Sequence, residues 1–280
     1  MLIDAVGDSV PGTAGAYRAT LVRLSRQLMA AQPAMAPLFR LVNDMLWEVG
    51  DAPSGGAMRL GALTYLQEYQ ARHEAALEAL AQRAAEFLAP HARPGSAIMT
   101  YSRSSTVSRV LQVLRVGNRD LRVYCSEGRP VLEGQALASE LAWADVEVTL
   151  GVDMALFGWL NEVQALVVGA DSLSAAGLVN KIGTAPLMRA AAEHELPRIV
   201  LCTGDKLLPG DYMLQQGLRS GDPEEIMPIA SRRLTVRNVY FDVTPLELVS
   251  TVITERGPLE RATLLAELAA LRTYPGLMGK

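Results

Sequence analysis

Two patterns of hydrophobic and polar positions divide the chain. Over residues 15–89, apolar side chains recur every three or four positions, for example at Tyr17, Leu21 and Leu24. This spacing is typical of helices with one buried face. Proline and glycine interrupt the pattern, most clearly at residues 53–56, and a segment rich in Ala, Leu, Glu, Gln and Arg follows. The pattern predicts a helical N-terminal region.

From residue 93 onward, short apolar runs alternate with helical patterns, which is typical of βαβ units and a parallel sheet. The predicted strands cover residues 97–101, 121–125, 146–152, 164–169, 198–202 and 239–241. The predicted helices cover residues 104–116, 131–143, 154–160, 181–195, 245–254 and 259–271. A polar segment at residues 204–233 is interpreted as a lid or an interface arm. We therefore predict an α/β protein with a helical domain at residues 1–92 and a parallel-sheet domain at residues 93–280.

Composition excludes several classes of protein. A formal net charge of −4 over 280 residues gives no global attraction to nucleic acid or to an anionic membrane, so we expect neither partner. Two cysteines form no disulfide framework, and three scattered histidines predict no metal site. No apolar run approaches membrane-spanning length, and no charged-then-apolar leader begins the chain. We expect a cytoplasmic protein without a metal or another cofactor.

The candidate chemistry lies in four loops that follow predicted strands at one edge of the sheet. The first loop spans residues 102–106, where hydroxyls and backbone amides at a helix start suit phosphate binding. An ordinary helix cap is the alternative interpretation. The second loop carries Arg129, a side chain suited to bidentate phosphate recognition or to a surface salt bridge.

The third loop contains Asp171, followed by Asn180 and Lys181. Small apolar neighbours around Asp171 suggest a raised pKa and a role in proton transfer, although a structural acid that caps the loop is equally compatible. The fourth loop carries Lys206, which either adds charge to the cleft or is solvated. Cys125 at a strand end is more typical of a buried, inert thiol than of a catalytic one.

Several segments together resemble the family of the alpha, beta and delta regulatory subunits of eukaryotic translation initiation factor 2B. This family also contains methylthioribose-1-phosphate isomerase and ribose-1,5-bisphosphate isomerase. The matching segments lie within residues 92–257: Ile98–Val107, Val123–Tyr124, Glu127, Arg129–Pro130, Glu133–Gly134, Gly169–Asp171, Val179–Thr184, Phe241–Leu248 and Ile253–Gly257. The resemblance implies a helical N-terminal domain, a Rossmann-like domain of the sugar-phosphate isomerase and coenzyme A transferase superfamily, and pairing through the C-terminal domain.

The resemblance also implies a chemistry. The enzymes of the family convert an aldose 1-phosphate into a ketose, using a cysteine after the first strand and the aspartate of a Gly-Ala-Asp motif. Here Asp171 matches the aspartate, whereas Ser102 stands at the position of the cysteine. A hydroxyl is a much weaker acid than a thiol. The implied site has catalytic candidates Asp171 and Ser102, and phosphate-binding candidates Arg103, Ser104, Ser105, Arg129, Asn180 and Lys181.

Two functions stay open at this point. One is a sugar-phosphate-binding protein with isomerase ancestry, including a divergent isomerase that uses Asp171. The other is a non-catalytic regulatory or ligand-sensing protein. In both cases the expected partners are a phosphorylated sugar or nucleotide-derived metabolite and further copies of the chain, as a homodimer or larger homo-oligomer. Both require Asp171, Arg129 and Lys181 to face one crevice.

Overall fold

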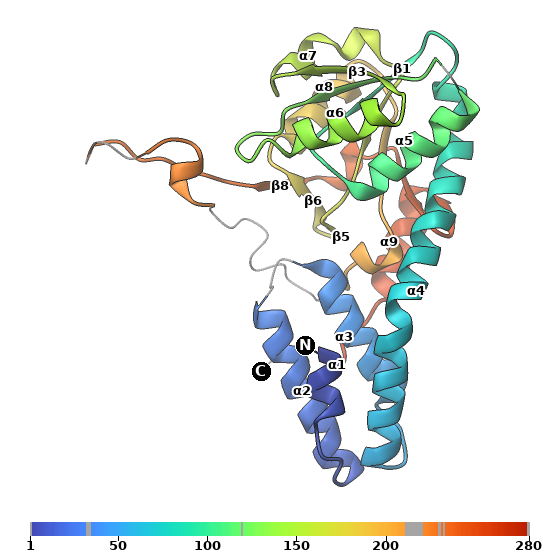
Figure 1. Ribbon diagram of the computed structural model, residues 1–280, viewed down its shortest axis with the longest axis vertical. Helices are drawn as coiled ribbons and strands as arrows, with labels where there is room; N and C mark the ends of the chain where they lie inside the picture. The colour runs from blue at the N-terminus through green and yellow to red at the C-terminus, as the bar shows by residue number, and fades with distance from the viewer. Residues whose placement is uncertain are drawn as a thin grey trace.

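The computed structural model describes residues 2–31, 35–118, 120–210, 221–228, 231 and 233–278. Its N-terminal part consists of the helices α1 (Leu2–Gly7), α2 (Ala14–Ala31), α3 (Ala36–Val49) and α4 (Gly55–Leu88). Helices α1 to α3 lie beside the first half of α4, and the second half of α4 runs along the sheet domain (Figure 1). The helical region predicted from the sequence is confirmed.

Helix α4 belongs to two hydrophobic cores. Its start is capped by Ser54, whose Oγ accepts a hydrogen bond from the Ala57 amide at 3.1 Å. Met58 in the first half of α4 packs with the cores of α2 and α3, whereas Leu80 in the second half packs with strand residues such as Ile98. The helix therefore connects the two regions, and the boundary between residues 92 and 93 stays a prediction.

The main sheet has seven strands. Their order is β10 (Gly257–Leu259), β9 (Thr251–Thr254), β7 (Arg198–Leu201), β4 (Ala165–Val168), β1 (Ala97–Thr100), β2 (Arg122–Ser126) and β3 (Glu147–Gly151). All pairs are parallel except β9 with β10. From β1 the chain builds outward to β2 and β3, and it then returns to β4 on the other side of β1. The order thus reverses between β1 and β4, the place where open α/β sheets form ligand crevices.

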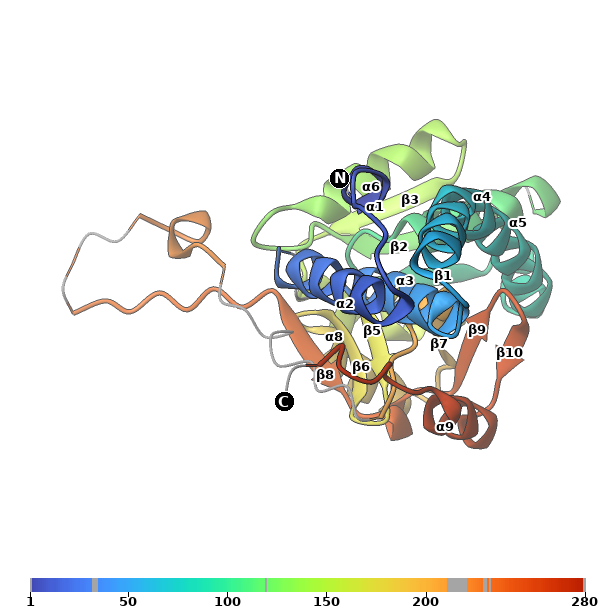
Figure 2. The same cartoon turned by 90° about the horizontal axis from the view of Figure 1, so that it is seen from below.

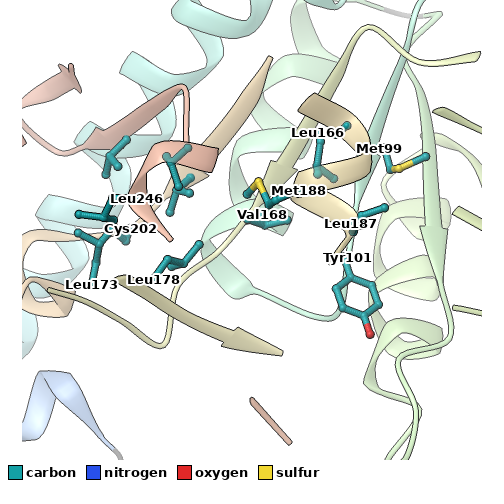
Figure 3. Close-up of a cluster of buried hydrophobic side chains, with 14 of the residues drawn as sticks. Met99, Tyr101, Leu166, Val168, Leu173, Leu178, Leu187, Met188, Cys202 and Leu246 are labelled. Carbon is teal, nitrogen blue, oxygen red and sulfur yellow. The ribbon is translucent and has the colours of Figure 1, made fainter. Parts of the chain in front are cut away.

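Helices cover both faces of this sheet: α5 (Ser105–Gly117), α6 (Glu133–Trp143), α7 (Ala155–Gly158), α8 (Thr184–Glu193) and α9 (Arg261–Ala270). Successive strand residues point to opposite faces. Ile98 accordingly packs in the core with α4 and α5, while Met99 packs in the other core with Leu187 and Met188 of α8 (Figure 3). The predicted parallel α/β domain is confirmed.

A small antiparallel sheet, absent from the sequence prediction, lies beside the main one. It contains β5 (Ser172–Ser174), β6 (Gly177–Lys181) and β8 (Phe241–Thr244). The predicted helix at residues 181–195 therefore begins only at Thr184, because Lys181 is the last residue of β6. Gly177 begins β6 at φ +138°, a conformation that side chains disfavour.

The predicted helix at residues 245–254 is wrong. The chain instead forms a short 3₁₀ turn, η5 (Leu246–Leu248), and then the buried strand β9. The run of β-branched residues from Thr251 to Thr254 favours a strand, since such side chains pack well on a pleated surface. The predicted helix at residues 154–160 is likewise two short pieces, α7 and η2 (Leu160–Glu162).

The polar segment at residues 204–233 is described in part. It contains the 3₁₀ turns η3 (Gly204–Lys206) and η4 (Pro223–Glu225), and the stretch around η4 projects away from the body in both views (Figures 1 and 2). Residues 211–220, 229–230 and 232 lie outside the described residues. The lid or arm interpretation stays a prediction. None of the helices in the described ranges is both long and apolar enough to cross a lipid bilayer.

Candidate functional site

A cavity of about 580 Å³ opens beside the carboxyl ends of β1 and β4, where the strand order reverses. Its walls come from the loops after these two strands, from the end of β6, and from α4 of the helical region. The two loops approach closely at Gly169, where an added Cβ would lie 2.5 Å from Ser104 Oγ. Glycine at this position therefore lets the Asp171 loop pack directly against the start of α5.

Seven of the eight predicted site residues line this cavity: Ser102, Arg103, Ser104, Ser105, Asp171, Asn180 and Lys181. Arg129 does not line it. The amides of Gly128 and Arg129 each donate a 2.9 Å hydrogen bond to the Asp153 carboxylate, which holds this loop toward β3, and the Arg129 residue is exposed. We expected Asp171, Arg129 and Lys181 to share one crevice. Asp171 and Lys181 do so, and Arg129 does not.

Asp171 is a partly buried acid held close to two lysines. It follows β4 through Gly169 and Ala170, and its amide donates to the Val179 carbonyl at 3.0 Å. Burial raises the pKa of Asp171 above the usual range, while the positive charges of Lys206 and Lys181 act in the opposite direction. A carboxyl group in this setting keeps its proton to a higher pH than an exposed aspartate and is suited to proton transfer.

Ser102 occupies a constrained backbone position and is hydrogen-bonded to an acid. Its φ is +63°, in the left-handed region, and the residue is 9% exposed. Ser102 Oγ donates to Glu133 Oε1 at 2.9 Å, and Lys181 Nζ lies 2.5 Å from the same oxygen. The preceding Tyr101 hydroxyl donates to the Ile182 carbonyl at 2.5 Å, which ties the β1 loop to the end of β6.

Glu133 is a site residue that the sequence-based analysis missed. It stands in the first turn of α6 and lines the cavity, and its Oε2 is buried without a hydrogen-bond partner among the described residues. The next residue, Gly134, lets α6 start against the end of β2, since an added Cβ would lie 1.7 Å from the Ser126 carbonyl oxygen. The available signal was the Glu133–Gly134 pair within the segments that resemble the family.

The end of β6 places Asn180 and Lys181, which are both buried. Asn180 Nδ2 donates to Thr184 Oγ1 at 3.2 Å, and this hydroxyl donates to the Lys181 carbonyl at 2.6 Å. Lys181 Nζ also lies 5.6 Å from the centroid of the Tyr240 ring. The Lys181 side chain is thus buried, paired with Glu133 and part of the cavity lining.

Besides the start of α6, the starts of α8 and α5 lie near the cavity, and they differ in what they offer to an anion. At α8, Asp242 already accepts hydrogen bonds from the amides of Gly183 and Ala185, at 2.8 and 3.1 Å. At α5, Ser104 caps the Val107 amide at 3.3 Å, and Ser105 and Thr106 also line the cavity. A helix start attracts negative charge. Of these two starts, that of α5 faces the cavity without a carboxylate of the described residues on its amides.

Arg103 lines the cavity, but its guanidinium forms an ion pair with Glu140 at 2.5 Å. This pair is exposed to solvent, and exposed ion pairs contribute about 0–1 kcal/mol to stability. An anionic ligand that enters the cavity would therefore compete with Glu140 at small cost.

Helix α4 supplies one wall of the cavity through Tyr69 and His73. Tyr69 Oη donates to Asp205 Oδ2 at 2.9 Å, and His73 Nδ1 lies 3.1 Å from the same oxygen. Burial, followed by the negative charge of Asp205, raises the pKa of Tyr69. The neighbouring Lys206 lines the cavity, which favours the interpretation that this lysine adds positive charge to the cleft. No local pattern in the sequence pointed to Tyr69 or His73, because these two residues lie more than 90 positions before Asp171.

The cysteines lie elsewhere. Cys125 in β2 and Cys202 after β7 are buried, and neither lines the cavity. Burial raises the pKa of Cys125 to about 11, so this thiol is protonated at neutral pH. The geometry thus favours the inert interpretation of Cys125. Within the described part of the chain, no group of three or more His, Cys, Asp or Glu side chains is arranged to hold a metal ion.

Comparisons with known proteins relate this site to a family. The model of the initiation factor 2 subunit family matches residues 2–261. The chain is 34% identical to methylthioribose-1-phosphate isomerase from Anaeromyxobacter sp. strain Fw109-5, over 95% of this chain and 82% of that protein. It is 35% identical to ribose 1,5-bisphosphate isomerase from Archaeoglobus fulgidus, over 60% of this chain and 55% of that protein. The second match thus spans about half of the relative's length.

The solved structure of the translation initiation factor eIF-2B from Pyrococcus horikoshii OT3 is similar, with a TM-score of 0.72 and 26% identity. The similarity covers 93% of this chain and 87% of that one. It extends over both the helical region and the sheet domain, so the whole architecture is shared. On the strength of the family model and these relatives, the chain belongs to the initiation factor 2 subunit family.

Proposed function

We propose that the protein binds a sugar phosphate in the cavity at the ends of β1 and β4 and isomerises it from aldose 1-phosphate to ketose with Asp171. The observation that carries this proposal is the position of Asp171, a partly buried acid with a raised pKa inside a cavity that also holds two lysines. The relatives named as sugar-phosphate isomerases support the substrate class. The composition predicts a cytoplasmic location, which forms part of the proposal.

The phosphate group would bind at the start of α5. Ser104, Ser105 and the first-turn amides offer donors there, and Lys181 and Lys206, which line the same cavity, supply positive charge. Asn180 would hold the Lys181 segment through its bond to Thr184. Arg129 has no part in this arrangement, because its loop is held by Asp153.

The experiment that tests the function is incubation of the protein with methylthioribose 1-phosphate and, separately, with ribose 1,5-bisphosphate, followed by NMR of the products. We expect conversion of at least one of the two into the corresponding ketose. Saturable binding without any conversion would contradict the catalytic part of the proposal, and the absence of both binding and conversion would contradict all of it.

A regulatory or ligand-sensing role is the second candidate, and one observation favours it. A hydroxyl stands at position 102, where the resemblance implies a thiol, and a hydroxyl gives up its proton far less readily. In this case the cavity binds the sugar phosphate, and the bound state is recognised by a protein partner. The NMR experiment distinguishes the two roles, because a sensor leaves the substrate unchanged.

We also propose a homodimer or larger homo-oligomer, which the resemblance to the family implies. The sheet ends at β3, and the exposed fractions of Leu150, Val152 and Met154 at this edge are 44%, 59% and 72%. Exposed apolar groups of this kind are common at protein–protein interfaces. Analytical ultracentrifugation at micromolar concentration is expected to show a species of at least twice the chain mass, and a monomer would refute the assembly.

A further inference from the structure

The proposed isomerisation needs a proton acceptor as well as a donor. The bond between the ring oxygen and C1 breaks, and the ring oxygen takes up a proton. The hydrogen on C2 moves to C1 with its electron pair, and the C2 hydroxyl loses its proton as its oxygen becomes the carbonyl. One proton is thus given and one is accepted in each turnover, and Asp171 alone cannot do both at the same moment.

Among the described residues, Ser102 and Glu133 form a pair in the cavity with geometry suited to this role. Ser102 Oγ lines the cavity, and its hydrogen is directed to Glu133 Oε1 at 2.9 Å. The left-handed backbone at Ser102 and the Glu133–Lys181 ion pair fix the two ends of this hydrogen bond. A hydroxyl hydrogen-bonded to a carboxylate is the arrangement that activates a weak acid for proton transfer.

We propose that Ser102 and Glu133 form a proton relay in this site, an inference that rests on the function proposed above. The C2 hydroxyl of the sugar phosphate donates its proton to Ser102 Oγ, and the serine proton passes to the Glu133 carboxylate. Asp171 gives a proton to the ring oxygen in the same turnover. Glu133 then returns its proton to solvent, and Asp171 regains one, so that the enzyme is restored without any co-reactant.

Three further observations support the relay. Glu133 Oε2 is buried without a partner among the described residues, so the carboxylate has an unused acceptor site. Lys181 contacts Oε1 at 2.5 Å and thereby orients the carboxylate toward Ser102. Glu133 and Asp171 also line the same cavity, where burial and, to a smaller extent, the negative charge of Glu133 raise the pKa of Asp171. Ser102 thus passes the proton on, and the Glu133 carboxylate is the group that finally accepts it.

A double-mutant cycle tests the relay. The variants are Ser102→Ala, Glu133→Gln and the combination of both, assayed by NMR with whichever of the two sugar phosphates the wild type converts faster. Glutamine keeps an oxygen for the hydrogen bonds from Ser102 and Lys181 but cannot take up a proton under these conditions. Each single change is expected to lower kcat about 100-fold, and the double variant should lie within about threefold of the single ones.

The split between kcat and substrate affinity distinguishes a relay from a purely structural role. Calorimetric titration of Glu133→Gln is expected to give a Kd within about threefold of wild type, since the shape and the hydrogen bonds are kept. Glu133→Asp keeps a carboxylate at a longer distance, and its kcat should therefore exceed that of Glu133→Gln about tenfold. The Asp variant also provides a second measurement if the Gln variant does not fold.

The outcomes separate the relay from the proposed function. Wild-type turnover together with a Glu133→Gln variant of full kcat would overturn the relay alone. The relay alone would also be overturned if the effects of the two single variants multiply in the double variant. It would be overturned as well if Glu133→Gln and Glu133→Asp bind the substrate more weakly but keep the wild-type kcat. Absence of turnover by the wild type would overturn the proposed function, and the relay with it.

Discussion

Replacing Asp171 by asparagine is expected to lower the rate of isomerisation about a thousandfold, because general acid–base groups contribute about 10²–10⁴ to a rate. Asparagine has nearly the same shape, but it can neither release nor accept a proton at neutral pH. Substrate binding should persist, since the lysines and the α5 start remain. The measurement is kcat by NMR together with a calorimetric Kd.

The matched control for this change is Asp145→Asn. Asp145 lies in a surface turn with its side chain 88% exposed and paired with Arg115, and it does not line the cavity. Its φ of +62° is a conformation that asparagine tolerates well. We expect kcat within twofold of wild type. An Asp171→Asn variant that turns over as fast as this control would remove Asp171 from the chemistry.

The Asp171→Asn substitution should not destabilise the protein at neutral pH. Burial raises the pKa of Asp171 in the folded state, so the contribution of this group to stability is present at low pH and is lost as the pH rises through the raised value. Asparagine has no charge to bury. The melting temperature of Asp171→Asn at pH 7 is therefore expected to equal or exceed that of wild type, and the difference should shrink on acidification.

Of the substitutions proposed here, Gly134→Ala is expected to lower the free energy of unfolding the most. The new Cβ would lie 1.7 Å from the Ser126 carbonyl oxygen, which is a backbone atom of a buried strand, so α6 would have to move. Overpacking of this kind costs about 3 kcal/mol or more, which lowers the melting temperature by roughly 6–12 °C in a chain of this size. Because Glu133 precedes Gly134, the displacement should also reduce any turnover.

Gly117→Ala is the control for the stability measurement. Gly117 is the last residue of α5, and an added Cβ would meet nothing within 4 Å. Alanine is the better helix former, so the free energy of unfolding should stay within about 1 kcal/mol of wild type. The measurement is the melting temperature of Gly117→Ala and of Gly134→Ala under identical conditions. Equal melting temperatures would show that the start of α6 is not packed as described.

Local signals account for the part of the site that the sequence predicted. A buried strand followed by a small-residue loop and an acid marked Asp171, and a strand followed by hydroxyl residues and a helix marked Ser102 and Ser104. The two loops converge because β1 and β4 are neighbours at the point of reversal. A repeated strand–helix pattern is sufficient to predict a parallel sheet with these loops at one edge, but it does not predict the strand order.

Long-range contacts account for what the sequence did not show. Tyr69 and His73 reach the cavity from α4, whose own pattern indicates only a helix. Arg129 follows a strand at the correct edge, but the Asp153 carboxylate, which lies 24 residues away, holds its loop elsewhere. Periodicity cannot distinguish a strand from a helix in a run as short as β9, and the β-branched residues Thr251–Thr254 were the signal that favoured a strand.

The most direct test of the account is a crystal structure of the Asp171→Asn variant in complex with the sugar phosphate that the wild type converts, or with methylthioribose 1-phosphate if it converts neither. We expect the phosphate group at the first turn of α5, near Ser104 and Ser105, with the sugar ring between position 171 and Ser102. A phosphate bound on another surface, with the cavity at the ends of β1 and β4 empty, would contradict it.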